Sequence, residues 1–155
     1  MKHLTPKQAY EFLQAHPEAA FIDCRTEMEY FYVGHPAGAA HIAWQEGPEW
    51  EVNRNFVPEV LRETETRDKP VVLICRSGSR TLLAGEALEA AGFAEVINVL
   101  HGFEGELDEQ DSRQLAADRE PAQLDELAHI GMARGVGRVE TAAEDAARHR
   151  AARSQ

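Results

Sequence analysis

Apolar residues in the first hundred positions fall into two patterns, short continuous runs and runs spaced at three and four residues. The continuous run at 71–74, Val-Val-Leu-Ile, follows Pro70 and has the length and β-branched composition of a strand buried on both faces. From Thr81 onward apolar residues recur at helical spacing until Gly92, which predicts a helix that ends at this glycine. The pattern therefore predicts a central strand, a short loop over 75–80 and a helix.

The rest of the chain repeats this alternation of strand and helix. Runs at 21–24 and 96–99 predict two further short strands, and Thr5 with Gln8 forms a capping box for a first helix. Strands that alternate with helices form parallel sheets with helices on both faces. The sequence predicts an α/β fold of this kind.

The segment between the predicted strand at 40–44 and a helix that opens at Pro58 has no clear period. Residues 44–56 contain Gly, Pro and Asn punctuation, which predicts a long loop. Its two tryptophans, Trp44 and Trp50, fit either the wall of a substrate pocket or the edge of the core, and the pattern leaves both uses open.

Composition restricts the function classes. The chain has 155 residues and a net charge of −11, so it is long enough for one packed domain with an appendage, and its charge argues against nucleic acid or an anionic membrane as a partner. No run approaches the roughly 20 apolar residues of a membrane span, and the first residues lack the apolar core of a secretory signal. With only Cys24 and Cys75 there is no disulfide framework, so we expect a cytoplasmic protein with free thiols.

The loop at 75–80 carries the candidate chemistry. Cys75 lies at the carboxyl end of the central strand, which is where open α/β sheets bind ligands. Ser77, Gly78 and Ser79 lead into a helix amino terminus and can point backbone N–H groups at an anion, while Arg76 and Arg80 add positive charge. These features favour the thiolate, the nucleophilic form of cysteine, so we predict that Cys75 is a nucleophile.

Three segments together resemble the rhodanese (thiosulfate sulfurtransferase) family in its single-domain form. They are the loop Cys75–Arg80, the stretch at 21–42 and the Gly-Phe-Glu-Gly at 102–105, which resembles the usual end of the family's domain. The resemblance covers roughly residues 4–109, in order and with ordinary spacing. The residues that carry the match in the stretch at 21–42 are Asp23, Arg25, Glu29, Gly34, His35, Gly38 and Ala39.

The resemblance implies a rhodanese-like domain over 1–109 and a sulfurtransferase activity. Cys75 would take the outer sulfur of a small anionic donor such as thiosulfate and hold it as a persulfide. Cyanide, a cellular thiol or a protein would then accept the sulfur. The loop residues Arg76, Ser77, Gly78, Ser79 and Arg80 would bind the donor and stabilise the anionic sulfur, with no cofactor and no metal.

The same resemblance implies supporting roles near the site. Asp23 and Arg25 would brace the neighbouring loop rather than react. Cys24 stands where the family usually has an aliphatic residue, so we interpret it as a packing residue instead of a resolving thiol. His35 and His41 lack a cluster of further ligands, and we expect both to make structural hydrogen bonds.

Two other functions remain open. The first is a phosphatase or arsenate reductase of this fold. Those enzymes hold their oxyanion in a longer loop, whereas only four residues separate Cys75 from Arg80. A non-catalytic binding or regulatory module is the second alternative, as for rhodanese-like domains that lack the cysteine.

Residues 110–155 change composition to Ala, Arg, Asp and Glu, and we treat them as a helical, partly flexible carboxyl-terminal extension. Residues 121–134 read as an amphipathic helix whose apolar stripe is Leu124, Leu127 and Ile130. Thr141 and Glu144 predict a capping box for a second helix. The stripe needs a partner, and we expect a homodimer through these helices.

Overall fold

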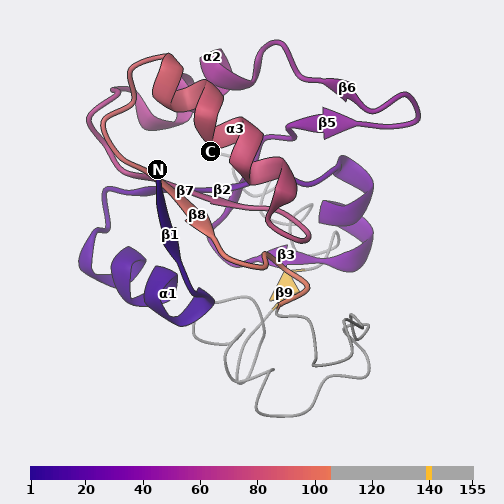
Figure 1. Ribbon diagram of the computed structural model, residues 1–155. Coiled ribbons are helices and arrows are strands. Elements are labelled where there is room, and N and C mark those ends of the chain that lie inside the picture. Colours follow the sequence, from indigo (N-terminus) through magenta and orange to yellow (C-terminus); the bar gives the residue numbers. More distant parts are fainter. Residues whose placement is uncertain (106–138, 141–155) are drawn as a thin grey trace, which may run out of the picture.

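The computed structural model of the protein describes residues 1–105 and 139–140. Its centre is a five-stranded sheet in which every pair of neighbouring strands runs parallel (Figure 1). In spatial order the strands are β1 (Lys2–Leu4), β8 (Val96–Val99), β7 (Val71–Ile74), β2 (Ala20–Asp23) and β4 (Ala40–His41). The carboxyl ends of β7 and β2 lie side by side, because Ile74 pairs with Asp23.

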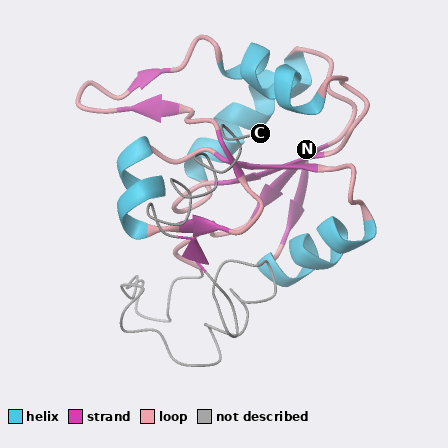
Figure 2. Ribbon diagram, turned by 180° about the vertical axis from the view of Figure 1, so that it is seen from behind, coloured by secondary structure: helices cyan, strands magenta, loops and turns pink. Residues whose placement is uncertain are grey.

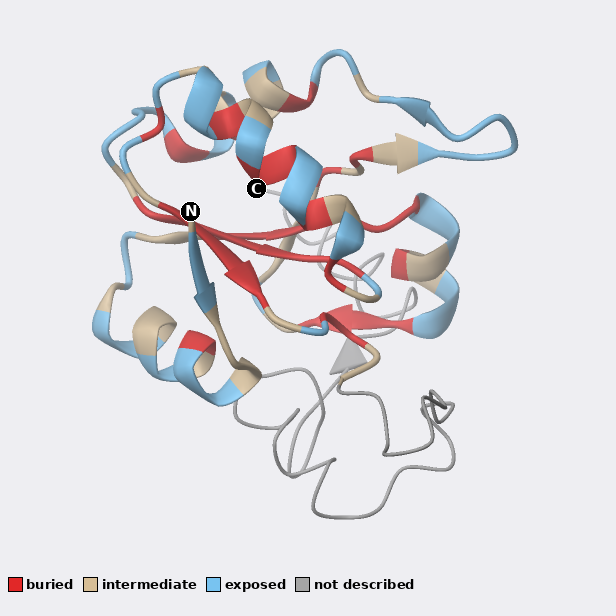
Figure 3. Ribbon diagram, viewed as in Figure 1, coloured by how far each residue is buried: buried red, intermediate tan, exposed pale blue. Residues whose placement is uncertain are grey.

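Helices cover both faces of this sheet, as the alternation of patterns predicted (Figure 2). Helix α1 (Pro6–Ala15) packs on one face, and α2 (Phe56–Thr64) and α3 (Ser79–Ala90) pack on the other. The central strand β7 is fully buried, because its alternate side chains enter both layers (Figure 3). One layer contains Val71 and Leu73, and the other contains Val72 and Ile74.

The predicted elements of the core are confirmed. The strand at 71–74 and the strand at 96–99 have the bounds expected from their apolar runs, and the capping box of Thr5 and Gln8 begins α1. Helices α2 and α3 each begin two residues before the predicted start. Strand β1 has no sequence signal, because it is three residues long and lies at the sheet edge with two exposed side chains.

The long loop predicted over 44–56 contains a short strand pairing that the sequence pattern did not predict. The chain forms a small antiparallel hairpin, β5 (Gln45–Glu46) and β6 (Glu51–Val52), ahead of α2. Each strand has only two residues and three of the four side chains are exposed, so no apolar alternation marks them. The strand expected over 40–44 is also shorter, because β4 ends at His41.

A second small pairing involves the part of the chain beyond the resemblance. Strand β9 (Val139–Glu140) lies antiparallel to β3 (His35–Pro36), which follows the one-turn π-helix η1 (Glu29–Val33). The helices predicted at 121–134 and from Thr141, and the boundary at Glu109, lie outside the described residues. Within 1–105 and 139–140 no helix has the length and apolarity needed to cross a membrane.

Candidate active site

Cys75 lies directly after β7, at the carboxyl edge of the sheet, and its side chain is completely buried. The apolar run before it explains this placement: a strand covered on both faces carries its next residue to the sheet edge. Open parallel sheets bind ligands at this edge. The structure therefore places the predicted nucleophile where the fold offers a site.

Two polar groups approach the Cys75 sulfur. The backbone N–H of Gly78 donates a hydrogen bond to Sγ at 3.1 Å, and the hydroxyl of Thr81 lies 3.6 Å from Sγ. Gly78 has a φ of 95°, a left-handed conformation that a glycine adopts without strain, and it turns the loop back toward the sulfur before α3 begins. A donor aimed at sulfur stabilises negative charge there.

The segment at 102–104 forms hydrogen bonds to the backbone of the Cys75 loop. The N–H groups of Phe103 and Glu104 donate to the carbonyl oxygens of Cys75 and Arg76, each at 2.8 Å. Gly102 has a φ of 54°, and a Cβ at this position would collide with the same two peptide groups. The Gly-Phe-Glu-Gly sequence is therefore part of the site's framework.

Asp23 and Arg25 form a buried pair that supports this framework. The Asp23 carboxylate accepts hydrogen bonds from the Arg25 backbone N–H at 3.0 Å and from its guanidinium at 2.7 to 3.2 Å. The Arg25 guanidinium also donates to the Gly34 carbonyl at 2.7 Å and lies 4.0 Å from the centre of the Phe103 ring. Phe103 in turn donates its backbone N–H to Cys75, so the pair is linked to the loop through one residue. Neither side chain is among the groups that approach the sulfur in the described part of the chain, which fits the predicted bracing role.

Arg80 and Glu29 form a bidentate ion pair between α3 and η1. The two guanidinium N–H groups donate to the two carboxylate oxygens at 2.8 and 2.9 Å. Burial alone would raise the pKa of Glu29, but hydrogen bonds from Arg80 and Thr26 outweigh burial and lower it to about 2. Burial would likewise lower the pKa of Arg80, and its bonds to Glu29 outweigh that effect and raise it. The predicted anion-binding guanidinium is thus already occupied by a carboxylate.

The other loop residues differ in their surroundings. Arg76 is paired with Glu104, and its side chain is 60% exposed. The hydroxyls of Ser77 and Ser79 lie 3.2 Å apart. The Arg80 side chain is only 13% exposed, so Arg76 is better placed to meet a dissolved anion.

Cys24 belongs to the core. It is fully buried among apolar side chains, and burial, followed by the neighbouring charges of Cys75 and Asp23, raises its pKa well above the usual value of 9.0. Both cysteines are free. A thiol held in its neutral form is a poor nucleophile, and this supports the interpretation of Cys24 as a packing residue.

The two histidines near this edge make the expected structural hydrogen bonds. His35 Nδ1 lies 3.0 Å from the Tyr30 carbonyl oxygen and its ring stacks on Tyr30, while His41 Nε2 lies 2.8 Å from the Arg25 carbonyl oxygen. Among the described residues, no three His, Cys, Asp or Glu side chains gather as metal ligands would.

The two tryptophans have different environments. Trp44 is buried against Phe56 in the core layer that includes α2 and α3. Trp50 lies at the turn between β5 and β6, where it is 54% exposed. Trp44 therefore belongs to the core and Trp50 to the surface.

Sequence reasoning did not identify two polar residues that contact the site. Thr81 was interpreted only as the start of the helical pattern, and Asn98 only as part of an apolar strand. Both are buried, and Thr81 Oγ1 lies 2.6 Å from Asn98 Oδ1. A polar residue inside the apolar run at 96–99 is the signal that could have drawn attention to Asn98.

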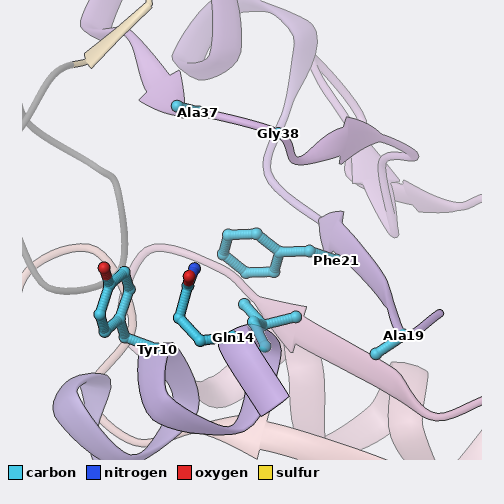
Figure 4. Close-up of a pocket in the computed structure, with 7 residues that line it drawn as sticks. Tyr10, Gln14, Ala19, Phe21, Ala37 and Gly38 are labelled. Atoms are coloured by element: carbon cyan, nitrogen blue, oxygen red, sulfur yellow. The ribbon is translucent and has the colours of Figure 1, made fainter. Parts of the chain in front are cut away.

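A cavity of about 210 Å³ lies away from this loop, between α1, the start of β2 and the turn after β3 (Figure 4). None of the predicted site residues lines it. Its lining residues are Tyr10, Leu13, Gln14, Ala19, Phe21, Ala37 and Gly38.

Known proteins resemble the chain over the region that contains this site. The family model of the rhodanese-like domain matches residues 5–108. A thiosulfate sulfurtransferase, GlpE of Haemophilus influenzae, is 29% identical over 104 residues, which are 67% of this chain and 86% of the relative.

Solved structures also resemble the chain over most of its length. The crystal structure of Rv0390 from M. tuberculosis has a TM-score of 0.62 and 37% identity, over 73% of this chain and 87% of that one. The solution structure of a polysulfide-sulfur transferase homodimer from Wolinella succinogenes has a TM-score of 0.54 and 26% identity, over 78% and 84%.

Proposed function

Because the chain belongs to the family of rhodanese-like domains, we propose that it is a sulfurtransferase that moves a sulfane sulfur through a persulfide on Cys75. GlpE of Haemophilus influenzae is named a thiosulfate sulfurtransferase, and this supports thiosulfate as a donor. The observation that carries the proposal is the position of Cys75, buried at the carboxyl edge of the sheet with a backbone N–H aimed at its sulfur.

The reaction has two displacements at sulfur. The Cys75 thiolate attacks the outer sulfur of thiosulfate, a sulfur–sulfur bond forms to Cys75, and the sulfur–sulfur bond of the donor breaks to release sulfite. Cyanide then attacks the outer sulfur of the persulfide, leaves as thiocyanate and restores the thiolate. Each bond that breaks leaves its electron pair on the departing group, so the cycle needs neither an oxidant nor a cofactor.

The surroundings of Cys75 support this chemistry mainly through fixed dipoles. The Gly78 N–H donates to sulfur, and the first N–H groups of α3 are of the kind that a helix leaves without intrahelical partners. Arg80 neutralises Glu29, so its contribution to donor binding is small. Arg76 is the arginine that we propose attracts the anionic donor.

The test is the intact mass of the full chain after incubation with thiosulfate. We expect the mass of one added sulfur atom on Cys75, and cyanide should remove it with release of thiocyanate. Cys75→Ser should show neither change, and Cys24→Ala serves as the matched cysteine variant that keeps both. Turnover of thiosulfate by Cys75→Ser would exclude the proposed mechanism, and a wild-type chain that never gains sulfur would favour the non-catalytic module.

We also propose a cytoplasmic setting and a small thiol, cyanide or a protein as acceptor. Two free cysteines are typical of a reducing compartment. A homodimer through residues 110–155 is part of the same proposal, and the relative from Wolinella succinogenes is a homodimer.

A further inference from the structure

Four polar groups form a line from the Cys75 sulfur to the edge of the sheet. The Thr81 hydroxyl lies 3.6 Å from Sγ, and Thr81 Oγ1 lies 2.6 Å from the side-chain amide of Asn98. The other side of that amide lies 3.2 Å from Nδ1 of His3. His3 on β1 is the residue in register with Asn98 on β8, so the strand pairing itself brings the last two groups together.

The inner part of this line is buried, and its outer end lies at the exposed edge of the sheet. Cys75 and Thr81 are fully buried and Asn98 is 2% exposed, whereas His3 is on the exposed edge strand. Buried polar atoms need partners, and a hydroxyl has a single proton to donate. The direction of each hydrogen bond in the line therefore depends on its neighbours.

Counting protons at Thr81 shows the constraint. Its hydroxyl oxygen is close to three groups that can accept: the Gly78 carbonyl at 2.9 Å, Asn98 Oδ1 at 2.6 Å and the Cys75 sulfur. When Asn98 presents its oxygen, that oxygen competes with sulfur for the single proton. A neutral Cys75 fits this arrangement, because the thiol donates its own proton to Thr81.

The opposite arrangement suits a charged sulfur. The oxygen and nitrogen of an asparagine amide exchange places when the amide turns over, at almost no change in shape. Asn98 then donates its N–H to the Thr81 oxygen and removes one competing acceptor, so Thr81 can donate to the Cys75 thiolate. The amide oxygen now faces His3, which must carry its proton on Nδ1.

We propose that Thr81 and Asn98 are positioning residues that stabilise the Cys75 thiolate, with His3 as the outer group that fixes the direction of the Asn98 amide. The inference rests on the nucleophilic role of Cys75 proposed above. No proton crosses the Asn98 amide: the thiol proton leaves to water, and the exposed ring of His3 exchanges its proton with water. Each group in the line instead determines the direction of the hydrogen bond that its neighbour makes.

Other charges act on the two ends of the line. Cys24, the residue after β2, and Arg80 on α3 are titratable groups that interact electrostatically with Cys75. Near His3, Lys2 pairs with Glu95 and the amino group of Met1 pairs with Glu89. These pairs are left unchanged in the variants below, so their effects are common to all of them.

The test measures alkylation of Cys75 by iodoacetamide across the neutral pH range, in the folded full chain, from the mass of the peptide that contains Cys75. Thr81→Val keeps the shape and removes the hydroxyl. We expect its alkylation rate at neutral pH to fall roughly tenfold and the midpoint of its pH profile to rise by about one unit. Both changes correspond to the loss of one charge-assisted hydrogen bond to the thiolate. Thr81→Ser should restore the wild-type profile.

Thr64→Val is the matched control. Thr64 is another buried helical threonine. Its hydroxyl lies 3.1 and 3.4 Å from two backbone carbonyl oxygens of its own helix, to which it can donate. It should lose a similar hydroxyl without any change in Cys75 alkylation. Equal profiles for Thr81→Val and wild type would overturn the proposal.

His3→Phe tests the outer end without touching the core. We expect the alkylation rate at neutral pH to fall by roughly two- to threefold, because Asn98 loses the partner that orients it. An unchanged rate would remove His3 and the amide orientation from the proposal. Because alkylation needs no sulfur donor, these results are independent of whether the chain turns over thiosulfate.

Discussion

Arg80 donates to both carboxylate oxygens of Glu29 across 51 positions of sequence, at 2.8 and 2.9 Å. The pair fastens η1 to the first turn of α3, directly after the Cys75 loop. It therefore couples the stability of the domain to the ionisation of one carboxyl group.

Acid should release this pair. The pKa of Glu29 is about 2 in the folded chain and 4.5 as its usual value, so its stabilisation is fully present above pH 4.5 and is lost as the pH falls from 4.5 toward 2. Glu29→Gln should be about 1 kcal/mol less stable at neutral pH, and the difference from wild type should shrink over that window. Urea unfolding at several pH values measures it, with the exposed Glu49→Gln as control. A difference that stays constant with pH would contradict this assignment.

Gly102→Ala should disable the site while leaving the sheet intact. A methyl group there collides with the peptide groups of Cys75 and Arg76, and the φ of 54° disfavours any side chain. We expect at least a roughly hundredfold fall in thiosulfate turnover, since displacing catalytic groups by about 1 Å costs that much. Gly47→Ala is the control, because a methyl group at Gly47 meets open space. Normal turnover in Gly102→Ala would show that the loop does not need this support.

The two loop arginines should behave differently on truncation. Arg80→Ala leaves the half-buried Glu29 unpaired, so we expect a loss of about 2 kcal/mol in the free energy of unfolding. Arg76→Ala should cost less than about 0.5 kcal/mol but raise KM for thiosulfate severalfold, and more than for a neutral persulfide donor. Added salt should imitate part of the Arg76 effect by screening. The exposed Arg62→Ala provides the baseline, and equal losses for both donors would point to a distorted loop instead.

Cys24→Ala should keep thiosulfate turnover within a fewfold of wild type and lower the free energy of unfolding by about 1 kcal/mol. The reason is that Cys24 is buried in the core, where its neutral thiol packs and does not react. Turnover assays and urea unfolding check the two parts. A Cys24–Cys75 disulfide in the oxidised chain, or loss of persulfide discharge in the variant, would instead make Cys24 a resolving thiol.

The carboxyl-terminal extension should affect assembly more than catalysis. We expect the full chain to be a dimer by light scattering, and a chain that ends after Glu109 to be a monomer that retains thiosulfate turnover. Every group that contacts Cys75 in the described structure precedes that position. A monomeric full chain would exclude the dimer, and a truncated chain that fails to fold would show that the extension belongs to the domain core and that the boundary at Glu109 is wrong.

Local signals in the sequence were sufficient for the elements that position the nucleophile. The apolar run at 71–74 is buried on both faces, and the capping box at Thr5 satisfies helix N–H groups through residues three positions apart. Such patterns depend on neighbours in the chain, so they can be read from it. The hairpin at 45–52 has no such pattern, because its short strands face water.

The partners of the site residues could not be predicted in the same way. The sequence places positive charge at Arg80, but the carboxylate that engages it comes from η1, and only the folded chain shows that Glu29 reaches it. The contact between Thr81 on α3 and Asn98 on β8 likewise exists only in the folded chain. Pattern reasoning identified the loop that carries Cys75, while the partners of the loop residues depend on contacts between distant segments.

The bonds from Phe103 and Glu104 to the Cys75 loop have a consequence for the order in which the protein is made. A ribosome synthesises β7, the loop and α3 well before it reaches Gly102. Until residues 102–104 have emerged, two loop carbonyls lack the donors that hold them in the finished fold. The nascent chain can thus complete most of its sheet while its cysteine loop is still unsupported, and the site is among the last parts of the domain to be assembled.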